Sequence, residues 1–414
     1  MSKPAPVVAP TLEEFEIAHE NVAQVAIQTP VLHSHYLSEL IGAEVYLKCE
    51  NLQRTGAYKL RGAFNRMSKL TPAEKKMGVI AASAGNHAQG VALAAKRLGI
   101  KATIFMPVGA SLPKFQATQN YGAEVVLEGA VFAETLKAAQ AHSAATGAIF
   151  IPPFDNIDVV TGQGTVGLEI LNQVPDVQNI LVAIGGGGLA AGVAVAAKLK
   201  AAQQGRKIKV IGVQSKNAAS YVPSLKAGKE VEIKTERTIA DGIAVAKPGH
   251  IPFELIAKHI DKVVTVSDDD IAKATVVLLE RSKQVVEPAG AAAVAALMSG
   301  AFKPKGKTVA VLSGGNIDPL LMQKIIGFGL TASERYTTIS VMLPDRPGQL
   351  VKTAEAIAAA QGNVVEVLHT RHGEGLEIGE VELRVSVETM GHEHRERVIQ
   401  ALKDAGLQPR ITQG

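Results

Sequence analysis

The sequence predicts an α/β protein with doubly wound, mostly parallel sheets, followed by a smaller domain of β-α-β-β-α-β order. From about residue 44 to 330, short β-rich runs alternate with longer helical patterns, which is typical of repeated strand–helix units. The hydrophobic fraction is 47% and the aromatic fraction only 4%, so the core is expected to consist mainly of Ala, Val, Ile and Leu. At 414 residues, the chain is too long for one ordinary domain.

Each expected strand of the first region is a short apolar run, and a helical pattern follows it. In parallel sheets of this kind, ligands bind at the carboxyl ends of the strands, where short glycine-rich joints fall in this sequence. The expected strands are residues 79–83, 101–107, 124–129, 180–185, 209–215, 263–267 and 308–314.

After about residue 330 the pattern changes to that of a ferredoxin-like split βαβ unit. A boundary is expected near residues 329–336, which gives a first domain at 1–330 and a second at 331–414. His392 and His394, in the run HEH, are interpreted as part of a solvated helix face rather than as metal ligands. The expected strands are 337–344, 363–372, 378–388 and 407–413, and the expected helices are 351–360 and 391–406.

Composition excludes several classes of function. A net charge of +4 is too small and too scattered to indicate nucleic acid or a membrane surface as partner. The single cysteine, Cys49, excludes an intramolecular disulfide and argues against a structural zinc site, so a packing role is expected. No uncharged run approaches the roughly 20 residues of a membrane helix, and the N-terminus lacks a signal-peptide pattern. We expect a cytoplasmic protein.

Four consecutive glycines, Gly185 to Gly188, lie between an expected strand and an expected helix. Glycines leave backbone amides unshielded, and a helix start adds positive potential, so the segment has the form of a phosphate cradle. It matches neither GxGxxG nor the Walker A motif, so a simple phosphate ester fits better than a nucleotide. A plain tight turn is the alternative reading.

Two further joints carry polar groups at expected strand ends. SAGNHAQG, residues 83–90, offers a hydroxyl, an amide and free helix N–H groups, which together could bind a carboxylate. LSGGN, residues 312–316, places Ser313 before two glycines. An N-cap and a turn are the plainer alternatives. Three such joints, expected at the carboxyl ends of strands in one sheet, are harder to explain as turns together than singly.

Lys59 falls in TGAYKLRGA, where a strand is expected to give way to a helix. A lysine beside a phosphate cradle, a carboxylate site and a hydroxyl supplies what a pyridoxal phosphate enzyme needs. These needs are an amine for the Schiff base, a phosphate site and a partner for the pyridine nitrogen.

The motifs TGAYKLRGA, SAGNHAQG, GGGGLAAG, VEPAGAA and LSGGN, in this order, resemble those of the fold type II pyridoxal phosphate enzymes, and specifically the threonine ammonia-lyases (threonine dehydratases). The resemblance covers roughly residues 11–330 and implies the tryptophan synthase β-like fold with two α/β subdomains. The tail, with DRPGQL after its first strand, resembles an ACT regulatory domain.

The resemblance implies a role for each residue that matches the family motifs. Lys59 holds the cofactor and removes the α-proton, and Asn86 bonds the ring hydroxyl. Ser313 meets the pyridine nitrogen, and Glu287 lies near the ring. The phosphate is held by Gly185, Gly186, Gly187, Gly188 and Leu189, and the substrate carboxylate by Ser83, Ala84, Gly85, Asn86 and His87.

Three details refine this reading. Ala57 and Tyr58 stand where family members usually show Ser-Phe, which could alter substrate choice. Ala84 stands where serine racemases of this fold carry a proton-donating serine, so racemisation is disfavoured. Some members bind a divalent cation after the strand at 209–215, but the neighbourhood here, Gln214, Ala219 and Ser220, lacks carboxylates. No metal is expected.

The expected activity is therefore conversion of L-threonine to 2-oxobutanoate and ammonia, in isoleucine biosynthesis, with L-serine as a second expected substrate. The runner-up is a dehydratase for serine or another β-hydroxy amino acid, and the non-enzyme alternative is an amino-acid sensor. The ACT resemblance implies a homodimer or homotetramer and an effector, isoleucine or valine, around residues 343–350 and a partner strand near Asn363. The effector's identity, the sign of regulation and a biosynthetic or catabolic role stay open.

Overall fold

The structure is a computed structural model that describes residues 7–371 and 376–412, and it divides into two compact units, Met1–Pro319 and Leu320–Gly414. Helix α14 (Pro319–Ala332) falls almost wholly within the second unit, whereas the expected domain boundary lies at residue 330. Among the described residues, no helix is both long and apolar enough to cross a membrane.

The first unit contains two sheets. The seven strands expected by range are all present, as is the strand expected before Lys59, β2 Val45–Cys49. Two very short strands, β1 and β6, were not expected. The strands are β1 Val31–His33, β2 Val45–Cys49, β3 Val79–Ala82, β4 Ala102–Met106, β5 Glu124–Leu127, β6 Ile149–Phe150, β7 Asn179–Ala183, β8 Lys209–Ser215, β9 Lys262–Val266 and β10 Thr308–Leu312.

The strand order of the two sheets determines which of the predicted site segments lie next to each other. One sheet has the order β1-β2-β10-β7-β8-β9 and is parallel except between β1 and β2, and the other has the order β5-β4-β3-β6 and is parallel throughout. β2, β10 and β7 are neighbours, so the segments that follow them start side by side. The expectation that residues 83–90 follow a strand of this same sheet is wrong, because β3 belongs to the other sheet.

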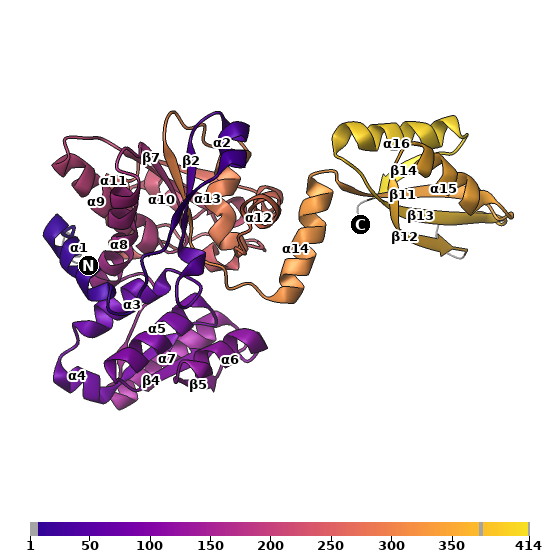
Figure 1. Cartoon of the computed structure of the whole chain (residues 1–414). Helices are drawn as coiled ribbons and strands as arrows, with labels where there is room; N and C mark the ends of the chain where they lie inside the picture. Colours follow the sequence, from indigo (N-terminus) through magenta and orange to yellow (C-terminus); the bar gives the residue numbers. More distant parts are fainter. Residues whose placement is uncertain (1–6, 372–375, 413–414) are drawn as a thin grey trace. The chain divides into compact units, whose positions relative to one another are not determined.

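The helices of the first unit pack on both sheets. The α-helices are α1 Leu12–Val22, α2 His35–Ile41, α3 Lys59–Ser68, α4 Pro72–Met77, α5 Asn86–Leu98, α6 Leu112–Asn120, α7 Phe132–Thr146, α8 Ile157–Gln173, α9 Gly188–Gln203, α10 Tyr221–Ala227, α11 His250–His259, α12 Asp268–Ser282 and α13 Pro288–Met298. Figure 1 shows α5, α6 and α7 gathered around β4 and β5 in the lower part of this unit.

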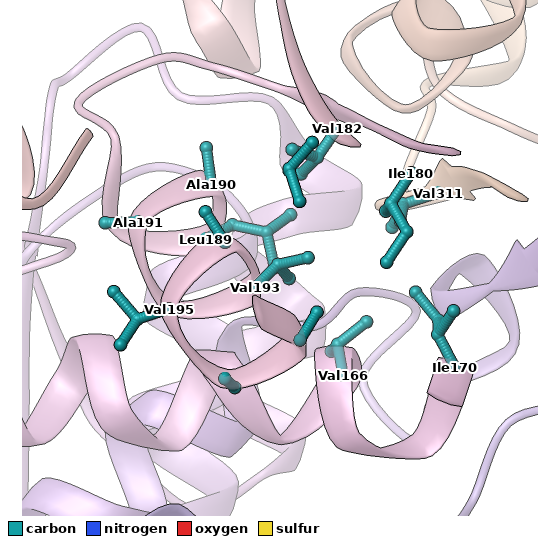
Figure 2. Packing of buried hydrophobic residues seen from close by; sticks show 14 of the residues in the cluster. Val166, Ile170, Ile180, Val182, Leu189, Ala190, Ala191, Val193, Val195 and Val311 are labelled. Atoms are coloured by element: carbon teal, nitrogen blue, oxygen red, sulfur yellow. The ribbon is translucent and has the colours of Figure 1, made fainter. Parts of the chain in front are cut away.

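Both faces of the six-stranded sheet are buried, as expected for a doubly wound fold. Successive side chains of a strand point to opposite faces. In β7, Ile180 and Val182 pack with α8 and α9, while Leu181 and Ala183 pack with α12 and α13. Figure 2 shows the first of these cores, in which Ile180 and Val182 lie opposite side chains of α8 and α9. This packing fixes the start of α9, which begins at the last glycine of the run. Cys49 is buried in the second core, which confirms its packing role.

The second unit contains the expected β-α-β-β-α-β order in an antiparallel sheet, β12-β13-β11-β14. Its core combines residues of β11 and β13 with apolar residues of both helices. Residues 372 and 413, at the ends of two expected strands, lie outside the described residues. The elements are β11 Tyr336–Pro344, α15 Gln349–Ala359, β12 Asn363–Thr370, β13 Glu380–Glu388, α16 His392–Asp404 and β14 Pro409–Thr412.

The interpretation of His392 and His394 as one solvated face is wrong for His394. His394 is 4% exposed, its Nδ1 accepts from the Met390 N–H at 3.0 Å, and its Nε2 lies 2.8 Å from the Ala360 carbonyl. Because a carbonyl only accepts, Nε2 carries the proton. His394 is thus a buried link between α16 and the end of α15, while His392 is exposed and pairs with Glu334 at 2.6 Å.

A buried network of charged side chains joins β2, α3 and α8. Lys48 Nζ lies 2.5 Å from Glu169 Oε2, and Arg61 lies 2.6 Å from Glu169 and 2.8 Å from Glu50. Each of these four side chains is at most 3% exposed. Although burial raises the pKa of Glu169, the nearby His19 and the Arg61 guanidinium bring that pKa below its usual value. Glu169 is therefore ionised, and its negative charge partly balances the positive charges of Lys48 and Arg61.

We expect Glu169→Gln to destabilise the first unit by about 3–5 kcal/mol, because it leaves the buried Lys48 without an ion-pair partner and Arg61 with Glu50 as its only buried one. The matched control is Glu124→Gln, which breaks the exposed pair of Glu124 with Lys101 (3.2 Å) and should change the free energy of unfolding by about 1 kcal/mol or less. Denaturant unfolding of both variants measures this. Equal stabilities of the two variants would contradict a structural role for the network.

Candidate active site

The loops that follow β2, β10 and β7 meet at one edge of the six-stranded sheet. They carry Lys59, Ser313 and Gly185–Gly188, respectively. The first two loops are joined by backbone hydrogen bonds, because the Tyr58 N–H donates to the Ser313 carbonyl at 3.2 Å and the Gly315 N–H to the Gly56 carbonyl at 2.8 Å. Three of the segments predicted from the sequence to form a site thus start from neighbouring strands.

Lys59 is the first residue of α3, and its amine is held by a neutral partner. Its Nζ donates to the Pro153 carbonyl at 2.9 Å and lies 5.3 Å from the centre of the Tyr58 ring. Burial lowers the pKa of Lys59 to about 8, although Glu287 raises it somewhat. An amine with this pKa is neutral far more often near neutral pH than an ordinary lysine, so it can act as nucleophile or base.

The glycine run forms a tight loop at the start of α9, which begins at Gly188. Gly187 has φ of +100°, and a Cβ there would collide with the Tyr221 hydroxyl, just as a Cβ at Gly186 would collide with the Phe154 ring. The first N–H groups of a helix lack partners within the helix and carry partial positive charge. The loop therefore offers bare amides at a positive helix end, and no side chain larger than hydrogen fits there.

Leu189 contributes differently from its glycine neighbours. Its side chain is 3% exposed and lies in the core between the sheet and α8 and α9, as Figure 2 shows. Only its backbone N–H can therefore face an anion at the start of α9.

Contacts through residues 153–154 connect the glycine loop to Lys59. Pro153 accepts the lysine hydrogen bond, and the neighbouring Phe154 packs against Gly186 and Gly188. The Tyr221 hydroxyl donates to the Gly186 carbonyl at 3.0 Å from behind the loop. Phe154 and Tyr221 were not expected from the sequence, since no local pattern marks a residue that supports a distant loop.

The segment Ser83–His87 joins β3 to α5. The Gly85 N–H donates to Ser83 Oγ at 3.2 Å, which folds the segment into a tight turn. His87 Nε2 lies 2.8 Å from the Ile151 carbonyl, so Nε2 carries the proton. Burial, together with the nearby Lys59, lowers the pKa of His87 to about 3, and its imidazole stays neutral. Ala84 lies within this turn and brings no proton donor.

Asn86 and Glu287 lie against each other beside the loop that carries Ser313. Asn86 Nδ2 donates to Glu287 Oε1 at 2.7 Å, and the Glu287 N–H donates to the Gly314 carbonyl at 3.0 Å. Burial, and secondarily the charge of Asp241, raise the pKa of Glu287 to about 7. Ser313 itself is 4% exposed. The structure thus brings Asn86, at the start of the helix that follows β3 of the smaller sheet, next to the loop that follows β10 of the larger sheet.

The residues present fit pyridoxal phosphate. The glycine loop is a cradle that a Cβ would fill, and Lys59 supplies an amine of lowered pKa. Ser313 directly follows β10, the strand between those that lead to the lysine and to the glycine loop. A phosphate site, an amine and a hydroxyl are therefore available from three adjacent strand ends.

The neighbourhood in which related proteins are expected to hold a cation is filled by an amide. Gln214 Nε2 donates to the Ala218 carbonyl at 3.3 Å, and Gln214 Oε1 accepts from the Tyr221 N–H at 2.9 Å. Within residues 7–371 and 376–412, no group of three or more His, Cys, Asp or Glu side chains is placed to hold a metal ion. The Gln214 side chain therefore binds the backbone of Ala218 and Tyr221.

The second unit has a hollow of about 650 Å³, open to solvent, where β11 leads into α15. Its lining includes the expected stretch from Leu343 to Leu350. The other lining residues, His369, Arg371, Val381 and Leu383, come from the end of β12, the residues just after it, and β13. Asn363 is not among them, because it lies at the opposite end of β12, paired in register with Glu388.

Comparison with known proteins gives close relatives along most of the chain. An L-threonine ammonia-lyase of Thermotoga maritima is 45% identical over 402 residues, which cover 97% of this chain and 99% of the relative. The catabolic L-threonine dehydratase TdcB of Escherichia coli is 46% identical over 320 residues, covering 77% of this chain and 96% of the relative.

Solved structures with the same fold also match most of the chain. A threonine deaminase isoform of Solanum lycopersicum has a TM-score of 0.73 and 38% identity, over 79% of this chain and 98% of that one. A maize serine racemase also has a TM-score of 0.73, with 34% identity over 77% of this chain and 97% of that one. The two neighbours share the fold and carry names of different reactions.

Family models account for both units. The model of the ACT domain matches residues 337–407, and the model described as pyridoxal-phosphate dependent enzyme matches residues 22–314. The match to the pyridoxal-phosphate dependent enzymes covers well over half of the chain and includes every site residue predicted in the first unit. The chain therefore belongs to the family of pyridoxal-phosphate dependent enzymes.

Proposed function

We propose that this chain dehydrates and deaminates L-threonine, giving 2-oxobutanoate and ammonia. The observation that carries the proposal is the meeting of Lys59, Asn86 and the glycine loop, in a chain 45% identical to an L-threonine ammonia-lyase. L-Serine, which has the same β-hydroxy amino acid core, is the second proposed substrate.

Bound pyridoxal phosphate supplies an electron sink that makes the α-proton of an amino acid acidic. In the proposed arrangement, Lys59 is its point of attachment, the backbone amides of residues 185–189 hold its phosphate, and Asn86 and Ser313 meet its ring. Because Ser313 is neutral, it does not force a proton onto the ring nitrogen as a carboxylate would.

Lys59 acts as the base in this proposal. A general base works best when its pKa lies near the operating pH, and burial brings the pKa of Lys59 to about 8. Its hydrogen-bond partner is the Pro153 carbonyl rather than a carboxylate, so no ion pair holds the amine in its charged form. Once released from the cofactor, the amine can therefore take up the α-proton.

The turn from Ser83 to His87 binds the substrate carboxylate, through its backbone N–H groups and the start of α5. Because His87 is neutral, it adds no positive charge that would compete for the cofactor phosphate. The orientation of the carboxylate then sets which face of Cα meets Lys59.

Two residues favour elimination over racemisation. Racemisation needs a proton donor on the face of Cα opposite the base, and Ala84 has no proton to give. The neutral Ser313 would leave the bound cofactor a weaker electron sink than a carboxylate would, which favours loss of the β-hydroxyl over return of a proton to Cα. The likeness to a maize serine racemase makes D-serine the side product to look for.

Regulation and assembly are proposed from the second unit. We infer that isoleucine or valine binds in the hollow at residues 343–350 and slows the enzyme, and that the protein is a homodimer or homotetramer. The apolar residues Val365, Val367 and Leu368 of the edge strand β12 are 53%, 39% and 52% exposed, which supports pairing of this strand with another copy. A pure amino-acid sensor would have no need of Lys59.

Purified, cofactor-loaded protein should release 2-oxobutanoate from L-threonine and pyruvate from L-serine, without forming D-serine. Lys59→Ala should lower the rate by about 10³-fold or more, because base and attachment point are both lost. The control Lys69→Ala, just after the same helix, removes an exposed ion pair with Asp158 and should leave the rate within about twofold. Coupled assays of oxo-acid release measure this.

Turnover by Lys59→Ala at the unaltered rate would refute the assignment of the base. Formation of D-serine without oxo acid would instead favour the racemase alternative, while leaving the cofactor site intact.

Isoleucine binding should weaken about tenfold in Arg371→Ala, since a guanidinium in the hollow can form a charge-assisted hydrogen bond with the effector carboxylate. The control is Arg384→Ala, on β13 outside the hollow, where the guanidinium pairs with Glu382 at 3.0 Å. Titration calorimetry with isoleucine and valine gives both affinities. Equal affinities of the two variants for isoleucine would contradict this location of the effector.

A further inference from the structure

Asn316, the last residue of LSGGN, joins three loops of the candidate active site. Its Nδ2 donates to the Thr55 carbonyl at 2.6 Å, in the loop before Lys59, and to Asn86 Oδ1 at 2.8 Å. Its amide also lies directly over Gly56, where a Cβ would collide with it. Asn316 follows β10, so a single side chain links the ends of β2, β10 and β3.

These contacts fix which end of each amide is which. The Thr55 carbonyl can only accept, so the atom of Asn316 that faces it must be the amide nitrogen. The same nitrogen faces Asn86, and the atom it meets there must be an acceptor, Oδ1. Nδ2 of Asn86 consequently points to Glu287 Oε1, at 2.7 Å.

Nδ2 of Asn86 has two N–H groups, and Glu287 uses one of them. The other is available to an acceptor in the site. If the amide of Asn86 were turned over, its oxygen would face the Glu287 carboxylate and could not donate to the cofactor ring.

We propose that Asn316 is a positioning residue that fixes Asn86 as a hydrogen-bond donor toward the cofactor ring oxygen. The inference rests on the proposed role of Asn86 toward that ring and is independent of which amino acid is the substrate. Asn316 acts through Asn86, and the Thr55 carbonyl sets the direction of the whole chain of amides.

A double-mutant cycle on cofactor affinity tests this, with cofactor-free protein titrated with pyridoxal phosphate and followed by its visible absorbance. Asn316→Ala should weaken binding about 3- to 10-fold, the usual effect of one lost hydrogen bond. Asn316→Asp should weaken it more, because the new carboxylate turns the Asn86 amide over. In an Asn86→Ala background, both effects should disappear.

The matched control is Asn179→Ala, a buried amide that donates to the Lys305 carbonyl at 3.0 Å and to Thr308 Oγ1 at 3.1 Å, away from the site. It should lower the melting temperature without changing cofactor affinity. An undiminished effect of Asn316→Ala in the Asn86→Ala background would overturn the proposal, as would an equal loss of affinity in Asn179→Ala. If the protein did not turn over threonine, this test would still be valid, because it measures cofactor binding alone.

Discussion

The site depends on the buried pairing of Arg61 with Glu50 and Glu169. Arg61 lies two residues after Lys59, and its guanidinium joins the end of β2 to α8 at 2.6 and 2.8 Å. Burying these charges costs several kcal/mol per ion, which only well-formed ion pairs and hydrogen bonds offset. A shift of α3 would break several of these contacts together, so the network restricts where the first residue of α3, Lys59, can lie.

Around that fixed lysine, burial rather than opposite charge sets the protonation states. It lowers the pKa of Lys59 to about 8 and that of His87 to about 3, and it raises the pKa of Glu287 to about 7. All three shifts favour neutral forms. The anions that the site is proposed to bind, a phosphate and a carboxylate, therefore meet mainly backbone amides and helix starts instead of mobile charged side chains.

Local sequence patterns were enough to predict most strands and the glycine-rich joints, because each depends on a few adjacent residues. They could not give strand order, so residues 83–90 were assigned to the wrong sheet, and β1 and β6, of three and two residues, carry too short a pattern. His394 resembles a solvated histidine until its contact with Ala360 is known. The contacts of Tyr221 and Phe154 with the glycine loop join residues that are far apart in the chain. The same holds for the link from Asn316 to Asn86, which spans 230 positions.

The most direct test of this account is the pH dependence of covalent cofactor attachment. Cofactor-free protein is mixed with pyridoxal phosphate at about pH 6 to 10, reduced with borohydride, and mapped by peptide mass spectrometry. Attachment requires the neutral amine, and a lowered pKa makes the amine neutral at lower pH, so labelling of Lys59 should rise to half its maximum near pH 8. Labelling centred on another lysine would contradict the account, as would labelling of Lys59 that is still rising steeply at pH 10, which the ordinary pKa of 10.5 would give.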